Sequence, residues 1–342
     1  MTLAETRAHT GTGSSGGWLA LRAAIAITLL WLVLRGAGAE ALGARFSRAT
    51  LPAVLAGSVL LLLSQALAAV RWRLLLGPGA PRLSALIHLY LVGAFFSLFL
   101  PTAVGGDAFR ATMVARSSPE PEAAVLSVVL DRVFGVLALL LFGVAGVLLD
   151  PASAGGLGVR LAGALAPGRL LLLVSAGLTG LAILALLARR QPRLRALPAT
   201  LAAALRATLA RGRSAALALL VSLAVQALMV LLWMVIARGV GLSLPASRFL
   251  VGVPLVSLAT MLPLSLAGLG VREWAWVWFL APFGVPSGDA VALSLSYFAC
   301  PLLAGLVGGA LFTARGAGPG LPPPAARAGD RPAAADPEST RG

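Results

Sequence analysis

The sequence predicts an all-α polytopic integral membrane protein with a pseudo-repeat architecture. Of its 342 residues, 59% are hydrophobic and only 11% are charged, whereas a soluble domain carries roughly 25% charged residues. The mean hydropathy is +0.94. Apolar runs long enough to cross a bilayer recur along the chain, and two shorter runs end in the same broken pattern.

This repeated pattern lies at residues 100–110 and 262–273. Each apolar run ends in Leu-Pro, continues through a small-residue turn with two glycines, and reaches an arginine nine positions after the proline. Proline and glycine interrupt helices, and backbone groups freed in hydrocarbon need protein or a water-filled cavity as partners. Two such breaks in corresponding positions of the two halves indicate a transport or lipid-handling site.

Hydropathy predicts about eight hydrophobic segments, namely six full transmembrane helices and two broken or re-entrant elements. The predicted full helices are 18–34, 51–70, 122–149, 169–188, 215–237 and 289–313. The broken elements are 83–100 with the turn after it, and 247–262 followed by a short aromatic helix at 272–281. The transmembrane domain, 18–313, lies between two tails predicted to be disordered, 1–17 and the Pro/Ala/Gly-rich 314–342.

Every basic residue of the chain is an arginine, and the formal net charge is +15. Arginine gathers in the cytoplasmic loops of polytopic proteins, so this charge indicates contact with lipid headgroups and not with nucleic acid. The most basic connector, 189–214, is predicted to be cytoplasmic and to contain an amphipathic helix at 194–210. If 83–114 enters from the cytoplasm and the second broken element from outside, both termini are cytoplasmic. Eight full crossings of the plasma membrane are the alternative.

Ionisable residues within the apolar sequence are the candidate binding residues, because each costs at least about 2.5–3.5 kcal/mol at membrane depth unless it faces a cavity or a partner. Arginine suits bidentate binding of phosphate, and glycine permits close backbone approach and hinge motion. Carboxylates would balance the arginines and contact a cationic headgroup. The predicted substrate-binding residues are Gly105, Gly106, Asp107, Arg110, Asp131, Arg132, Gly268, Gly270, Arg272 and Glu273.

A structural role is the alternative for the charged residues. Asp107 could cap the helix after its turn, and Glu273 could complement the dipole of the helix that it opens. Asp131 and Arg132 point about 100° apart on a helix, so we expect them to pair inside the protein. The expected partner is Arg110, Arg272 or Glu273.

Two aromatic clusters are predicted to lie at the membrane interface. The first, Arg71-Trp72-Arg73, directly follows the 51–70 helix and would anchor its cytoplasmic end. The second is the triplet Trp274, Trp276 and Trp278. The single cysteine makes a disulfide within the chain impossible, and no spacing of ligands predicts a metal site. We expect no metal, no cofactor and no catalytic residues.

Several motifs together resemble the lysylphosphatidylglycerol synthase transmembrane-domain family, also called flippase-like. They are 93–101, Gly105-Gly106-Asp107 with Arg110, 131–135, 268–273 and 71–76, and they fall in family order over roughly residues 20–313. The resemblance implies a membrane protein of about eight hydrophobic segments that translocates lipid. In fusion members, this domain moves aminoacylated phosphatidylglycerol, and a separate soluble domain attaches the amino acid. We expect a stand-alone member without that soluble domain.

One departure from the family pattern concerns the second broken element. It lacks an acid before its glycines, so anion binding there would depend on Arg272.

The predicted function is that of a lipid flippase without enzymatic activity. It would move an anionic or aminoacylated phospholipid, or a polyprenyl-phosphate-linked lipid, across the cytoplasmic membrane. The alternative is a non-transporting scaffold or lipid-binding partner of a separate envelope glycolipid or lipid-modifying enzyme. A membrane-embedded lipid transferase is the least favoured class, because Asp107 and His88 are the only candidates for its acceptor-activating base.

Overall fold

The computed structural model describes residues 50–99, 105–118, 120–153, 192–261 and 268–315. All regular structure within these ranges is helical. The helices are α3 (Thr50–Leu76), α4 (Leu83–Phe99), α5 (Gly105–Ser117), α6 (Pro121–Leu149), η1 (Pro151–Ser153), α9 (Pro192–Ala210), α10 (Gly212–Gly239), α11 (Ala246–Met261), α12 (Val271–Leu280), η3 (Ala281–Phe283) and α13 (Ser287–Arg315). The predicted helices 18–34 and 169–188, the tail 1–17 and residues 316–342 lie outside the described ranges.

Four of the described helices are long and apolar enough to cross a membrane, namely α3, α6, α10 and α13. They coincide with four of the six predicted full helices. Large apolar side chains are exposed along one face of α3 and of α6, and they recur every three or four positions. Such a face contacts lipid tails in a bilayer. The prediction of an all-α, multi-pass membrane protein is therefore confirmed.

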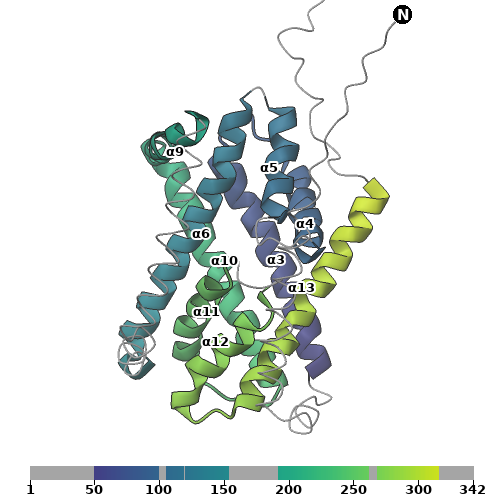
Figure 1. Cartoon of the computed structure of the whole chain (residues 1–342), viewed down its shortest axis with the longest axis vertical. Coiled ribbons are helices and arrows are strands. Elements are labelled where there is room, and N and C mark those ends of the chain that lie inside the picture. Colours follow the sequence, from purple (N-terminus) through teal and green to yellow (C-terminus); the bar gives the residue numbers. More distant parts are fainter. Residues whose placement is uncertain (1–49, 100–104, 119, 154–191, 262–267, 316–342) are drawn as a thin grey trace, which may run out of the picture.

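Each broken element folds as a hairpin of two short helices. In the first hairpin α4 packs against α5, and in the second α11 packs against α12. Figure 1 shows α4 and α5 in the upper half of the molecule and α11 and α12 in the lower half. The two hairpins thus enter from opposite ends of the molecule.

The long helices form the frame that holds these hairpins. α10 packs along α3, α13 crosses both α3 and α4, and α11 packs on α6. The largest core cluster joins α3, α10, α11, α12 and α13. The frame therefore fixes each hairpin against helices that span the full length of the molecule.

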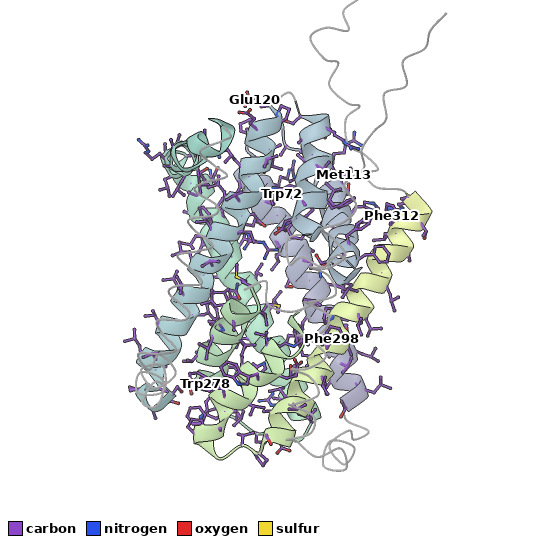
Figure 2. All side chains as sticks on the ribbon, in the orientation of Figure 1. Trp72, Met113, Glu120, Trp278, Phe298 and Phe312 are labelled. Carbon is purple, nitrogen blue, oxygen red and sulfur yellow. The ribbon has the colours of Figure 1, made fainter. Side chains whose placement is uncertain are left out.

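The aromatic triplet of α12 does not form one interfacial belt. Trp276 is fully buried and packs against Trp233, with 4.8 Å between their ring centroids, and against Phe249. Trp274 is exposed, and Trp278 lies near the lower end of the molecule (Figure 2). The interface prediction was wrong for Trp276, because alternate positions of a helix point to opposite sides and this one points into the core.

Asp150 ties the end of α6 to the start of α11. Its carboxylate accepts hydrogen bonds from the hydroxyls of Ser153 at 2.8 Å and Ser247 at 3.0 Å. These bonds, the one from Ser153 first, lower the pKa of the Asp150 carboxyl. The link holds the second hairpin beside α6.

Candidate functional site

An ion-pair network, here called the arginine cluster, lies inside the upper half of the molecule. Its members are Arg71 of α3, Tyr90 of α4, Asp107 and Arg110 of α5, and Asp131 and Arg132 of α6. Asp131 lies at its centre and is only 1% exposed. One carboxylate oxygen accepts a hydrogen bond from Arg71 Nε at 2.6 Å, and the other accepts one from the Tyr90 hydroxyl at 2.5 Å. Arg110 Nη1 lies 3.7 Å from Asp131 Oδ2.

Asp107 holds the outer part of the same cluster. It lies in the first turn of α5, pairs with Arg110 one turn further on, and accepts a hydrogen bond from Arg132 Nε at 2.5 Å. Asp131 therefore pairs inside the protein with one of its expected partners, Arg110. The other two alternatives, Arg272 and Glu273, form a separate cluster in the lower half. They lie on the other hairpin, which enters from the opposite end.

Arg110 is the least satisfied member of the arginine cluster. It is 4% exposed, and its guanidinium carbon lies 3.8 Å from the centroid of the Tyr90 ring and 5.0 Å from that of Trp72. Its Nη1 is buried and has no hydrogen-bond partner among the described residues. The cluster combines three arginines with two aspartates, so it carries one excess positive charge. Arg71 and Arg110 are buried with the two aspartates, whereas the side chain of Arg132 is half-exposed, so the unbalanced charge lies at the edge of the cluster.

The glycine turn of the first hairpin brings α4 and α5 into close contact. Gly105 and Gly106 begin α5, and both are buried. A methyl group at Gly106 would overlap the carbonyl oxygen of Gly93 and the hydroxyl of Ser97. The Gly106 N–H donates to Ser97 Oγ at 3.2 Å. The predicted close backbone approach is present, but this N–H is used within the hairpin and is not free for an anion.

The second cluster, here called the Glu273 cluster, joins the start of α12 to Ser294 of α13. Glu273 is fully buried: Oε2 accepts the Gly270 N–H at 2.6 Å, and Oε1 accepts Arg272 Nη2 at 3.1 Å and the Ser294 hydroxyl at 2.7 Å. Arg272 Nε also donates to Ser294 at 2.9 Å. Glu273 thus caps α12 and fixes the orientation of Arg272. Gly268 and Gly270 have φ of 74° and 83°, which favours glycine at this turn.

A cavity of about 340 Å³, here called the central cavity, lies between the two hairpins. The first hairpin contributes Ser97, and the second contributes Thr260 and Arg272. Tyr297 and Phe298 of α13 complete this side, and their ring centroids lie 5.2 and 5.1 Å from the Arg272 guanidinium carbon. Figure 2 shows Phe298 beside the second hairpin. The volume is in the range of small-ligand sites, about 300–1,000 Å³.

A second cavity, here called the arginine cavity, has a volume of about 190 Å³. It is lined by members of the arginine cluster, by Gln226 of α10 and by Met261 at the end of α11. Met261 follows Thr260, which lines the central cavity. The two cavities therefore adjoin the same hairpin tip, one on each side.

The largest departure from the sequence prediction is the position of Arg71. The predicted interface anchor is wrong for this residue, because α3 continues to Leu76 and buries both Arg71 and Trp72. The indole of Trp72 donates to Ser127 Oγ at 2.9 Å, while Arg73 is exposed. The opposite orientations of Arg71 and Arg73 were detectable from the sequence, since residues two positions apart on a helix point to opposite sides.

Sequence analysis also missed Tyr90, Tyr297 and Ser294. Tyr90 and Tyr297 are the only two tyrosines in the chain, and one lies beside each buried arginine of the two hairpins. The signal was a phenol within an apolar helix, since a buried hydroxyl requires a hydrogen-bond partner. Asp131 supplies that partner for Tyr90.

No curated protein and no solved structure matches the chain, but a family model does. The model of the family described as lysylphosphatidylglycerol synthase TM region matches residues 19–309. This range includes both hairpins, both clusters and both cavities. The chain therefore belongs to the family of lysylphosphatidylglycerol synthase transmembrane regions.

Proposed function

We propose that this protein is a lipid translocase that moves a lipid with an anionic phosphate across the plasma membrane without catalysing a chemical reaction. The candidate substrates are an anionic or aminoacylated phospholipid and a polyprenyl-phosphate-linked lipid. The proposal depends chiefly on the central cavity, which both hairpins line from opposite ends of the molecule. Family membership supports a lipid-related function at the membrane.

The obstacle to moving such a lipid across the bilayer is the charge of its headgroup, because its tails are already soluble in the hydrocarbon. A charged group in the middle of a bilayer requires a polar cavity or a partner of opposite charge. Arg272 provides a guanidinium in the central cavity, and guanidinium groups bind phosphate by paired hydrogen bonds. The excess positive charge of the arginine cluster would attract the same phosphate on the other side of the α11 tip. The acyl or prenyl chains would remain in the bilayer.

Charge distribution supports a cytoplasmic position for the upper end of the molecule. Most arginines at described helix ends lie there, namely Arg73, Arg82, Arg116, Arg206, Arg211, Arg213 and Arg315. The lower end carries Arg238 and Arg248. By the positive-inside rule, the first hairpin would enter from the cytoplasm and the second from outside. The C-terminus would then be cytoplasmic, and the N-terminus is assigned there as well.

Lipid sidedness in proteoliposomes tests this proposal. The reporters are fluorescent phosphatidylglycerol, its lysyl derivative and a fluorescent polyprenyl phosphate, each assayed for transfer between leaflets. Wild-type protein should accelerate transfer of at least one lipid. Arg272→Gln should slow it roughly 10- to 100-fold, because a charged hydrogen bond contributes about 1.5–3 kcal/mol.

Arg238→Gln is the matched control, since Arg238 is exposed at the end of α10 and lines neither cavity. Both variants are compared at equal reconstituted amounts of folded protein. Failure of the wild type to accelerate any of the three lipids would reject translocation.

A non-transporting, lipid-binding partner of a separate envelope enzyme is the second candidate. The observation that favours it is that both aspartates of the arginine cluster are already paired with arginines, as in a purely structural network. A scaffold of this kind would tolerate Arg272→Gln without loss of function. The same proteoliposomes separate the two candidates, because a scaffold accelerates no lipid by itself.

A further inference from the structure

We infer that the central cavity accepts a lipid phosphate whose headgroup is an uncharged polyol, such as glycerol or a sugar, and excludes a cationic aminoacyl headgroup. The inference depends on the proposed translocation and narrows its substrate class. It follows from three features of the cavity wall: the charges that line it, the groups that already occupy its aromatic rings, and an unpaired amide oxygen.

The charge on the described part of the cavity wall is positive. Among the described residues that line the cavity, Arg272 is the only one with a charged side chain. A phosphate would therefore meet a guanidinium, whereas an ammonium would meet a like charge.

The three carboxylates of the two described clusters are already engaged. Glu273 is fully buried and uses both oxygens within its own cluster. Asp107 and Asp131 are paired with arginines in the upper half. A lysyl headgroup would bring one or two ammonium groups, and a cation in a low-dielectric cavity is costly without a partner of opposite charge. None of these three acids is free to serve as that partner.

The aromatic rings of the described wall residues offer no free cage for a cation. Arg272 itself lies near the rings of Tyr297 and Phe298. The opposite ring system, Trp233, stacks on Tyr297 with centroids 4.1 Å apart and contacts Trp276 on another side. Cation–π stabilisation depends on access to a ring face, and the cation nearest these faces belongs to the protein.

The remaining polar groups suit hydroxyl groups. Ser97, Ser257 and Thr260 line the cavity with neutral hydroxyls that both donate and accept. Gln65 Oε1 is buried and has no hydrogen-bond partner among the described residues. An unpaired buried acceptor is costly, and a headgroup hydroxyl in this cavity would donate to it. Neutral donors and acceptors around a single arginine thus match a phosphate joined to a polyol.

The test compares headgroups in wild-type proteoliposomes at a fixed acyl composition. The lipids are fluorescent phosphatidylglycerol, phosphatidylinositol, lysyl-phosphatidylglycerol and phosphatidic acid, with a polyprenyl phosphohexose as a second source of a sugar phosphate. We expect at least one polyol lipid to cross at least about tenfold faster than lysyl-phosphatidylglycerol. The order of the transfer rates of the glycerol, inositol and hexose lipids identifies the preferred polyol.

The variant Gln65→Leu tests the polyol contact itself. It should slow the preferred polyol lipid by about tenfold and change phosphatidic acid transfer by less than about twofold, because phosphatidic acid has no headgroup hydroxyl for Gln65. Ser296→Ala is the control, since it also removes a buried unpaired oxygen but lies outside the cavity lining.

The outcomes separate this inference from the proposed function. Transfer of lysyl-phosphatidylglycerol as fast as the polyol lipids would overturn the headgroup assignment and leave translocation intact. Equal slowing of every lipid by Gln65→Leu would overturn the polyol contact. If no lipid is accelerated by the wild type, translocation itself fails. The headgroup comparison in the wild type needs no variant, so a folding defect in Gln65→Leu does not remove the test.

Discussion

At the scale of single residues, the fold is organised by charges that cannot be left alone in hydrocarbon. Asp131 binds Arg71 through one oxygen and Tyr90 through the other, and Glu273 distributes its two oxygens over a helix N-terminus, an arginine and a serine. In both cases the acid orients an arginine that lines a cavity. The acids therefore act on the proposed substrate through the arginines that they position.

Replacement of Arg71 tests the structural half of this arrangement. Arg71→Gln removes the 2.6 Å ion pair to Asp131 and leaves that buried carboxylate with the Tyr90 hydroxyl and the more distant Arg110. Loss of one partner of a buried pair costs about 3–5 kcal/mol, so we expect a clear fall in the thermal unfolding temperature of the detergent-purified protein.

Arg73→Gln is the natural control for this prediction, because Arg73 lies two residues away on the exposed side of α3. It should change stability by no more than about 0.5 kcal/mol. Equal losses of stability in the two variants would show that the buried ion pair stabilises the fold no more than an exposed arginine does. The double variant Arg71→Gln/Asp131→Asn should recover part of the loss, since neither charge then remains unpaired.

At the scale of elements, each hairpin combines a helix that enters the molecule with a helix that returns. The first hairpin is held together where Gly106 meets Gly93 and Ser97. The second is held by the positive φ of Gly268 and Gly270 and by the Glu273 cap. The repeated Pro-Gly-Arg pattern thus encodes one topology with two different local solutions.

Gly106→Ala tests the contact in the first hairpin. The added methyl would overlap the backbone oxygen of Gly93 as well as the Ser97 hydroxyl, and backbone cannot move aside as a flexible side chain can. Overpacking of this kind costs about 1–3 kcal/mol, which thermal unfolding should detect. Gly212→Ala is the control, because a methyl there would contact nothing and alanine favours the helix. A Gly106→Ala protein as stable as the wild type would contradict the close helix approach.

At the scale of the whole molecule, the sequence was sufficient for the long helices among the described residues and insufficient for the charge pairing. Length and hydropathy predicted α3, α6, α10 and α13 to within a few residues except at the end of α3, because a long apolar run in lipid has no alternative to a helix. The prolines and glycines predicted both hairpins. The pairing of Arg71 with Asp131 spans 60 positions. Helix spacing puts Arg71 and Arg73 on opposite sides of α3, but no local pattern says which of them turns inward or which acid it meets.

The orientation of the molecule gives the last prediction, since it determines from which side each hairpin opens. Glu120 is exposed at the upper end between α5 and α6 (Figure 2), and Ser243 is exposed at the lower end between α10 and α11. Introduced singly, Glu120→Cys and Ser243→Cys can be labelled with a membrane-impermeant maleimide. The natural cysteine, Cys300, is fully buried and should contribute little background.

Arginines cluster at the upper end, so Ser243→Cys should react in intact cells and Glu120→Cys only in inside-out vesicles. The reverse pattern would invert the assignment, with the first hairpin opening to the outside. Labelling of both positions from one side would contradict the crossing of the membrane between them.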